Sequence, residues 1–302
     1  MLYDILHTTT YDYRAEVLIS QQVLRLAPRE LTRQRCQQYE LRIQPQPSEV
    51  SWFVDYFGNR ATFLTLESPH SQFQVHARSR VEVLPQNVPN AYATPTWEAV
   101  RDNCSSLSGA EAIETGDFLY DSPLVHRRHC FLEFAQPSFT PGRPLLDAVL
   151  DLTQRIYNDF KFDGSATTVA TPLEEVLRVR RGVCQDFTHL QIACLRSLGL
   201  PARYVSGYLE TTPPPNQPRL VGVDASHAWT SFYCPGHGWI DVDPTNNLLP
   251  MDKHVTLGWG RDYSDISPVR GVILGTGDHS LRVAVDVMPV APAPSSVNPR
   301  IL

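Results

Sequence analysis

The first 85 residues have the pattern of short β-strands. Several segments, beginning with residues 1–13, alternate apolar and polar side chains and are separated by Pro, Asn, Gly or Ser. Such alternation is typical of strands with one buried face. The sequence FGNR at 57–60 predicts a hairpin turn, because Gly and Asn accept the backbone angles of tight turns. Residues 1–85 are therefore expected to form a β-rich domain of the sandwich or small-barrel type.

Residues 86–142 lack a regular pattern. Prolines interrupt the stretch, and short helices are predicted near 96–103 and 108–120. The sequence HRRHC at 126–130 brings two His and one Cys together. No second pair of ligands follows at a spacing familiar from metal sites. We therefore expect an irregular or helical connection and no metal ion.

Helical periodicity begins at residue 144. Apolar residues at intervals of three and four predict helices over 144–160 and 184–200, the second of them buried. A third helix is expected over 171–182, with Thr171 and Glu174 forming a capping box at its start and Gly182 as its stop. The strands predicted in this half are 202–210, 225–233, 239–243 and 280–289.

These elements predict an α+β protein with an N-terminal β-rich domain. We expect the β-rich domain at 1–85, the irregular or helical connection at 86–142 and a catalytic α+β core at 143–290. The Pro- and Ser-rich end at 291–302 is expected to be a loose tail.

Composition narrows the class of protein. With 302 residues, 42% of them hydrophobic and 19% charged, the chain is typical of a soluble globular protein. A net charge of -6 argues against a nucleic-acid partner. No apolar run reaches the roughly 18 residues that span a bilayer, and the N-terminus lacks the features of a signal peptide. We therefore expect no membrane partner, a cytoplasmic location, and six cysteines that are mostly free thiols.

Cys184 has the position of a nucleophile. It begins the predicted helix 184–200, directly after Arg-Arg-Gly-Val. The free N–H groups and positive dipole end of a helix N-terminus stabilise a thiolate and can hold an oxyanion. Cys194 lies in the middle of the same helix between apolar neighbours, so it is expected to be a core residue instead.

His227 and Asp243 are predicted to lie side by side. His227 starts the strand at 225–233, Asp243 ends the strand at 239–243, and a tight turn joins the two strands. In an antiparallel hairpin the start of one strand lies opposite the end of the other. The carboxylate can then orient the imidazole as a base for the thiol. Asp241 would share the strand face of Asp243, and spacing alone hardly separates the two.

Three other polar residues are expected to play no part in the chemistry. His189 lies roughly 140° around the helix from Cys184, which makes it a poor base. Asp186 is near the helix start and is expected to cap free N–H groups. His237 lies in a Gly-flanked turn and is expected to be solvated.

The second half of the chain resembles the core of the bacterial transglutaminase-like proteins. The matching segments are RRGVCQDFTHLQIACLRSLGLPARYVSGYL and HAWTSFYCPGHGWIDVDPTNN. In that core the Cys of G-x-C-x-D, the His of H-A-W and the Asp of D-P-T form a triad. Carried over, the triad is Cys184, His227 and Asp243, so the resemblance favours Asp243 over Asp241.

The remainder of the chain resembles one bacterial subgroup of these proteins. HTTTYDY, LRLAPRE and DYFGN match the β-rich region that precedes the core in that subgroup, and GRDYSDISPVRGVILG fits it near the C-terminus. The resemblance implies a papain-like α+β fold, with the cysteine helix packed against an antiparallel sheet that carries the His and the Asp. It implies amide chemistry on a protein or peptide substrate without a required cofactor.

Several features of the reaction stay open. The resemblance implies a second oxyanion donor upstream of the cysteine, near Tyr157, Phe160 and Phe162. The Pro-rich loop at 211–224 borders the acyl pocket or is a plain surface loop. We expect hydrolysis, as in a cysteine protease or amidase, because water is always present. The alternatives are transamidation that forms isopeptide bonds and a non-enzymatic peptide-binding module.

Overall fold

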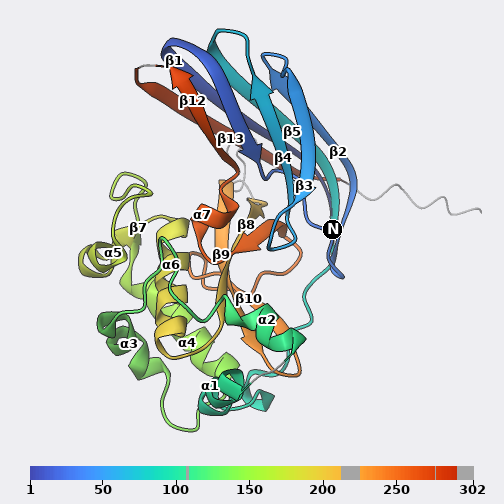
Figure 1. The fold of residues 1–302 in the computed structure, drawn as a ribbon. Coiled ribbons are helices and arrows are strands. Elements are labelled where there is room, and N and C mark those ends of the chain that lie inside the picture. Colours follow the sequence, from blue (N-terminus) through green and yellow to red (C-terminus); the bar gives the residue numbers. More distant parts are fainter. Residues whose placement is uncertain (107–108, 212–224, 276, 291–302) are drawn as a thin grey trace, which may run out of the picture.

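The computed structural model describes residues 1–106, 109–211, 225–275 and 277–290. Figure 1 shows a sheet of long strands above a second region, in which most helices lie to one side of a smaller sheet and below it. The strands are β1 (Leu2–Leu24), β2 (Gln34–Gln44), β3 (Glu49–Val54), β4 (Arg60–Leu66), β5 (His70–Val83), β6 (Lys161–Phe162), β7 (Arg181–Gly182), β8 (Ala202–Leu209), β9 (Ala225–Cys234), β10 (Gly238–Val242), β11 (His254–Gly260), β12 (Val269–Gly275) and β13 (His279–Pro289).

The helices belong to the second region, together with two short 3₁₀ turns. The helices are α1 (Trp97–Ser106), α2 (Ala110–Gly116), α3 (His129–Ala135), α4 (Leu145–Asp159), α5 (Leu173–Val179), α6 (Cys184–Ser197) and α7 (Tyr263–Ile266), and the 3₁₀ turns are η1 (Ala91–Ala93) and η2 (Gln136–Ser138). The proposed acyl-pocket loop, apart from Thr211, and the predicted tail at 291–302 lie outside the described residues.

The N-terminal sheet is organised around the long strand β1. Strands β2, β5, β1, β4 and β3 are neighbours in that order, and β12 and β13 also pair with β1. The first half of β1 pairs with β5 and β13, and its second half pairs with β4 and β12. The two halves enclose an apolar cluster that includes Leu24, Leu64 and Phe73. The expected N-terminal β domain is present, and its strands form one continuous sheet.

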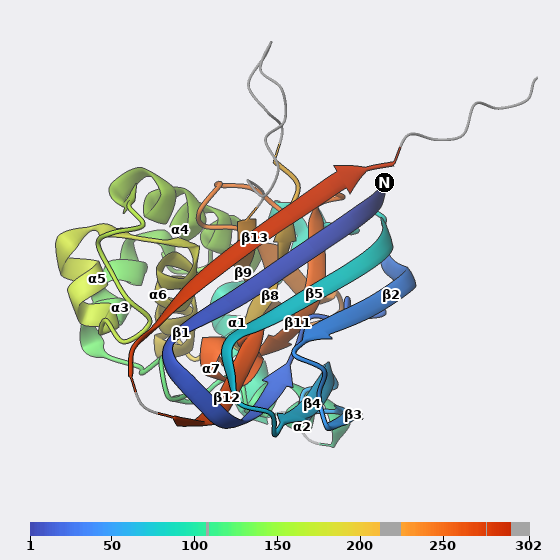
Figure 2. The same ribbon diagram turned by 90° about the horizontal axis from the view of Figure 1, so that it is seen from above.

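The last two strands of the chain join this N-terminal sheet. Tyr3 on β1 pairs with Pro289 on β13, and Leu24 pairs with Val269 on β12. The prediction assigned these strands to a core running through 143–290, so the structure corrects that boundary. The physical reason is that β1 needs partners for its backbone N–H and C=O groups on both edges. Figure 2 shows β13, β1, β5 and β2 side by side above the smaller sheet.

The smaller sheet carries the second half of the chain. Its strand order is β10-β9-β8-β11, all antiparallel, and α6 packs against β8 and β9. Strand β11, with the sequence HVTLGWG, was not predicted. A register shift between Thr256 and Gly258 leaves Leu257 without a partner on β8, which makes Leu257 the bulge residue.

The stretch 86–142 contributes to the core of this second region. Helices α1 and α2 lie near the two predicted positions, whereas α3 was not predicted. Val100 of α1 and Phe131 of α3 are buried in the same cluster as residues of α4 and α6. The stretch is therefore a packed part of the α+β region as well as a connection.

Helix α5 differs from its prediction at both ends. It spans Leu173–Val179, and Pro172 is its N-cap without a side-chain hydrogen bond. The predicted capping box is wrong, because the Thr171 hydroxyl instead accepts a hydrogen bond from the Thr168 N–H at 2.9 Å. The helix ends at Arg180, whose φ of 56° is left-handed, two residues before the predicted stop at Gly182.

A buried apolar interface, called the joint below, holds the long-stranded sheet and the second region together. Tyr3 and Val285 from the long-stranded sheet share a buried cluster with Tyr208 and Val255 of β8 and β11. Polar contacts surround this cluster, among them a hydrogen bond of 2.7 Å from the Gln34 side chain to the Thr256 carbonyl. The joint fixes the position of the long-stranded sheet over the face of the smaller one. Among the described residues, no helix is both long and apolar enough to cross a membrane.

Candidate active site

Cys184 is the first residue of α6, as predicted. The backbone N–H of the N-cap residue Val183 donates to the Asp186 carboxylate at 2.8 Å, and the Thr167 hydroxyl donates to the same oxygen at 2.6 Å. The capping role predicted for Asp186 is thus confirmed. A methyl group on Gly182 would lie only 2.6 Å from that oxygen, so glycine is required for this close approach.

The structure places His227 and Asp243 in direct contact. Strands β9 and β10 form the expected antiparallel hairpin, in which Val242 pairs with Thr230. His227 Nε2 lies 2.7 Å from Asp243 Oδ2, and both side chains are buried. The hairpin argument from the sequence therefore predicted this contact correctly.

The contact controls the charge of both groups. Burial lowers the pKa of His227, but its hydrogen bonds with Asp243 and Cys184 outweigh burial and raise that pKa to about 10. Burial likewise raises the pKa of Asp243, but hydrogen bonds from His227 and His254 prevail and hold it below its usual range. The pair is therefore an imidazolium and a carboxylate at neutral pH. Because Nε2 contacts the carboxylate, Nδ1 is the ring nitrogen left for the thiol.

Further donors hold the Asp243 carboxylate in place. Its Oδ1 accepts from the backbone N–H groups of Thr245 and Asn246 at 2.9 and 3.2 Å. Its Oδ2 accepts from the Asn246 amide at 2.7 Å and lies 3.1 Å from His254 Nε2. Sequence reasoning missed both Asn246 and His254. The DPTNN turn contained a signal for Asn246, whereas His254 lies on the strand that was not predicted.

A glycine on the central strand brings His254 close to the site. Gly207 of β8 pairs with His227 on one side and with Thr256 on the other. A methyl group there would lie 2.5 Å from the Trp229 ring. In its absence the Trp229 ring packs edge-on against His254, with ring centroids 5.2 Å apart. The His254 ring is thereby held against the Asp243 carboxylate.

His227, Asp243 and His254 are also a conceivable set of metal ligands. Their ligand atoms lie within 4.8 Å of one another. However, the separations of 2.7 and 3.1 Å between the imidazole nitrogens and Asp243 Oδ2 are hydrogen-bond distances. Ligands bound at the usual 2.0–2.1 Å around a tetrahedral zinc ion lie about 3.3 Å apart. The spacing therefore fits a proton between each pair of atoms better than a shared metal ion.

The structure separates Asp241 from Asp243. Asp241 Oδ2 lies 2.6 Å from an Arg33 guanidinium nitrogen, in an ion pair that links the two regions. His189 is also removed from the site, because its Nε2 accepts from the Tyr263 N–H at 3.1 Å. Burial lowers the pKa of His189 to about 4, so it is neutral at pH 7. His237 is exposed, as expected.

The upstream aromatic residues do not meet the expectation of an oxyanion donor. Tyr157 and Phe162 are exposed, and Phe160 packs edge-on against Phe187 in the core. None of these three is among the described residues that line the pocket at Cys184. The expected donor is therefore not found among these three residues.

Cys184 and His227 open into one pocket of about 260 Å³. The long-stranded sheet forms one wall of this pocket, through residues of β1 and β13. The smaller sheet, the start of α6 and the segment from α7 to β12 form the other walls. Cys184 and His227 thus face a space between the two regions.

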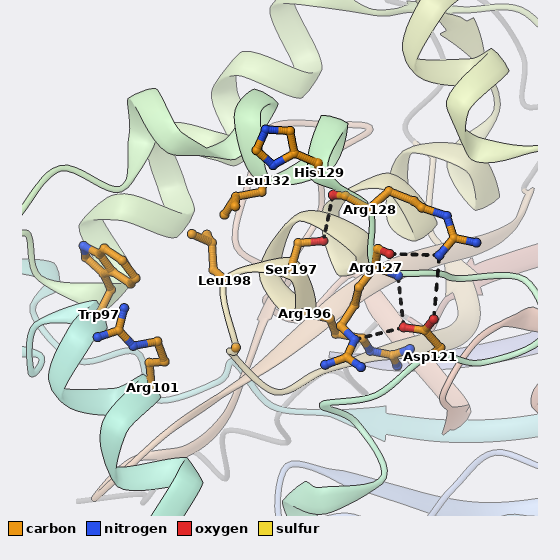
Figure 3. Close-up of a pocket in the computed structure, with 11 residues that line it drawn as sticks. Trp97, Arg101, Asp121, Arg127, Arg128, His129, Leu132, Arg196, Ser197 and Leu198 are labelled. Carbon is orange, nitrogen blue, oxygen red and sulfur yellow. Dashed lines mark hydrogen bonds and ion pairs between the residues drawn. The ribbon is translucent and has the colours of Figure 1, made fainter.

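A larger cavity of about 690 Å³ lies elsewhere, and Figure 3 shows its lining residues. Arg127 Nε lies 2.9 Å from Asp121, so a carboxylate offsets the positive charge there. The Ser197 hydroxyl donates to the Arg128 carbonyl at 3.4 Å, and the His129 imidazole pairs with Glu133 outside the cavity. The described lining contains no cysteine and no paired nucleophile and base.

A cysteine at a helix N-terminus, packed against an antiparallel sheet that presents a His–Asp pair, defines the papain-like α+β class of fold. Family models agree with this geometry. Residues 3–82 match the bacterial transglutaminase-like N-terminal region, and residues 133–244 match the transglutaminase-like superfamily. The chain belongs to the transglutaminase-like superfamily and carries this bacterial N-terminal region.

Comparisons with individual proteins extend over most of the chain. The uncharacterized protein Rv2569c of Mycobacterium tuberculosis is 40% identical over 296 residues, which cover 95% of this chain and 92% of the relative. The crystal structure described as a "putative cysteine protease" from Cytophaga hutchinsonii superposes with a TM-score of 0.72 at 22% identity, covering 97% and 93% of the two chains. A protein-glutamine gamma-glutamyltransferase of Pseudomonas aeruginosa is 38% identical over 73 residues, which are 24% of this chain and 11% of that protein.

Proposed function

We propose that this protein is a thiol-dependent acyl-transfer enzyme that acts on protein or peptide amides. The observation that carries the proposal is the shared position of Cys184, His227 and Asp243: the cysteine begins α6, and the histidine contacts both it and the aspartate. Membership of the transglutaminase-like superfamily supports the same class of reaction.

The first step is attack on the amide carbonyl. The proton that Cys184 gives up is held by His227 at Nδ1, and Asp243 stabilises this imidazolium through Nε2. The thiolate sulfur forms a bond with the carbonyl carbon, and the carbonyl oxygen becomes an oxyanion. The Cys184 backbone N–H at the start of α6 is positioned to donate to that oxyanion. A donor of this kind typically contributes about 3 kcal/mol.

The second step releases the amine and leaves a thioester. The imidazolium of His227 gives its proton to the leaving nitrogen as the carbon–nitrogen bond breaks. His227 then removes a proton from water or from an incoming amine, which attacks the thioester carbon. The sulfur departs as a thiolate, so Cys184 is restored. Water yields a carboxylic acid, whereas an amine yields a new amide.

We infer hydrolysis as the main outcome. Water reaches any open pocket, whereas transamidation needs a site that favours an amine over water. The short match to a protein-glutamine gamma-glutamyltransferase supports transamidation as the second candidate. Both outcomes share the thioester, so the acceptor molecule alone separates them.

The test uses peptides that contain Gln, incubated with the protein in the presence and absence of a primary amine. Mass spectrometry distinguishes peptide-bond cleavage, deamidation and incorporation of the amine. Cys184→Ala is expected to abolish all three reactions. Cys36→Ser is the matched thiol control, because Cys36 lies on β2 in the N-terminal sheet and is expected to leave activity unchanged.

The outcomes separate the candidate functions. Cleavage or deamidation that is indifferent to the amine identifies a hydrolase, and amine-dependent products identify a transamidase. If peptides bind but Cys184→Ala retains every measurable activity, the enzyme proposal is wrong and a peptide-binding module is the better description.

A further inference from the structure

The pocket at Cys184 has a roof made by the N-terminal sheet. Tyr11 of β1 and Leu281 and Val283 of β13 line it, opposite Cys184 and His227. Tyr11 precedes Cys184 by more than 170 positions in the sequence, whereas Leu281 and Val283 follow it by about 100 positions. The sheet is therefore part of the substrate-binding wall and not merely an attached domain.

Alternation along β13 directs its apolar side chains toward the pocket. Leu281 and Val283 line the pocket, and their side chains are 52% and 48% exposed. Arg282, between them, pairs instead with Asp12 of β1 at 2.8 Å. Because successive side chains of a strand point to opposite faces, the charged residue is turned away from the pocket. The exposed apolar pair remains available to a ligand.

The wall is uncharged apart from the catalytic pair. Among the described residues that line the pocket, none is Asp, Glu, Lys or Arg. Tyr204 and Tyr263 add aromatic surface, and Ser206 adds a neutral hydroxyl. A charged substrate group in this space would lose its water without gaining a partner, which is strongly unfavourable.

The two polar residues of β1 that line the pocket are also neutral. His7 Nε2 lies 2.7 Å from the Thr9 hydroxyl, whereas His7 Nδ1 is buried without a hydrogen-bond partner. Burial lowers the pKa of His7 to about 4, which leaves the imidazole uncharged at pH 7. These groups therefore supply no charge to a ligand on the roof side.

The volume limits the size of the occupant. The pocket measures about 260 Å³, which corresponds to roughly nine water molecules at about 30 Å³ each. It is smaller than the roughly 300–1,000 Å³ that is usual for drug-sized ligands. One large side chain with its adjoining amide fits this space, whereas a folded segment does not.

We propose that this pocket binds the uncharged, apolar side chain next to the reacting carbonyl, and that Leu281 and Val283 of the N-terminal sheet select it. This inference rests on the proposed function, because it assigns the acyl-donor specificity of the same cysteine. The substrate class is then a peptide or protein whose residue at the reacting amide is neutral and apolar or aromatic.

The test measures alkylation of Cys184 by chloroacetamides, which need no known substrate. The probes are 2-chloroacetamide, its N-benzyl derivative, and N-benzyl derivatives bearing a para-carboxylate or a para-aminomethyl group. Peptide mass spectrometry gives the rate at Cys184, and the rate of each probe with free cysteine removes differences in intrinsic reactivity. The neutral benzyl probe is expected to react at least about tenfold faster than 2-chloroacetamide, because its ring is buried. Both charged probes are expected to lose most of that advantage.

Variants of the roof sharpen the test. Leu281→Lys is expected to reduce the benzyl advantage to less than about threefold, because it places a charge in the apolar wall, and to favour the carboxylate probe over the cationic one. The matched control is Leu274→Lys on β12, which is also exposed but does not line the pocket. It is expected to behave like the native protein.

The results separate this inference from the proposed function. If 2-chloroacetamide reacts rapidly in a manner that depends on His227, but benzyl and charged probes show no preference, the pocket assignment is overturned and the thiol function stands. If alkylation is slow and independent of His227, Cys184 is not activated and both proposals fall.

Discussion

Replacing Asp243 with Asn removes the charge that opposes His227 and preserves the shape of the side chain. In the native protein the imidazolium persists up to about pH 10, because hydrogen bonds with Asp243 and Cys184 outweigh burial. In Asp243→Asn the largest remaining influence is burial, which lowers the pKa of His227. The imidazole is then expected to be neutral at about pH 6, so no cation stabilises the thiolate.

The size of the effect follows from the thiol equilibrium. A cysteine without a cationic partner titrates near pH 8.5, so at pH 6 only roughly 1 in 300 molecules carries a thiolate. In the native protein the positive charge of the neighbouring imidazolium favours the thiolate form. Alkylation of Cys184 by iodoacetamide at pH 6 is therefore expected to slow by roughly 300-fold. At about pH 9.5 both proteins carry a thiolate, so their rates are expected to approach each other.

The assay follows Cys184 by peptide mass spectrometry across this pH range. Asp241→Asn is the matched control, because that carboxylate lies two residues away and pairs with Arg33 at 2.6 Å. Its profile is expected to follow that of the native protein. Fast alkylation at pH 6 in Asp243→Asn would show that Asp243 does not sustain the ion pair, and equal losses in both variants would point to a general disturbance of β10.

Three further predictions concern stability. The raised pKa of His227 contributes stability that is complete below the unfolded pKa of about 6.5 and is lost toward pH 10. The free energy of unfolding of the native protein is therefore expected to decline across that window, as measured by urea denaturation at several pH values. If His227→Gln shows the same decline with pH, this account is wrong. Gly182→Ala is expected to lower the free energy of unfolding by about 1–3 kcal/mol and to slow alkylation of Cys184, because the methyl group displaces the Asp186 carboxylate from the start of α6. An unchanged stability together with an unchanged alkylation rate would contradict this account of the helix start. His254→Phe keeps a ring against Trp229 but removes a donor to Asp243, so a loss of about 1.5–3 kcal/mol is expected in urea denaturation; no loss would mean that the 3.1 Å contact contributes little.

The sequence predicted the elements that depend on neighbouring residues. The helix that begins at Cys184 follows from its apolar periodicity, and the β9–β10 hairpin follows from two strands joined by a tight turn. The contact between His227 and Asp243 follows from that hairpin in turn. These predictions succeeded because a short loop leaves an antiparallel pair almost one register. The capping box at Thr171 failed because the competing hydrogen bond to Thr168 is equally local.

Contacts between distant segments were decided by the tertiary structure. Strand spacing could not choose between Asp241 and Asp243, although the resemblance favoured Asp243. The physical reason for the choice lies in the tertiary structure, where Arg33, more than 200 residues away, pairs with Asp241. His254 reached the site through β11, which pairs with β8. The glycines of β11 allow close packing by distant segments, because a methyl group on Gly258 would lie 2.4 Å from the Asn59 side chain.

The sequence by itself therefore determined the helix that begins at Cys184, the contact between His227 and Asp243, and the class of fold, since each rests on local periodicity, a short turn or a motif. It did not determine the roof of the pocket. That roof is built by β1 and β13, from opposite ends of the described chain, because the backbone groups of the long first strand needed partners on both edges. No local sequence pattern predicts which strand will pair with each edge of β1, so only the folded chain shows what surrounds Cys184.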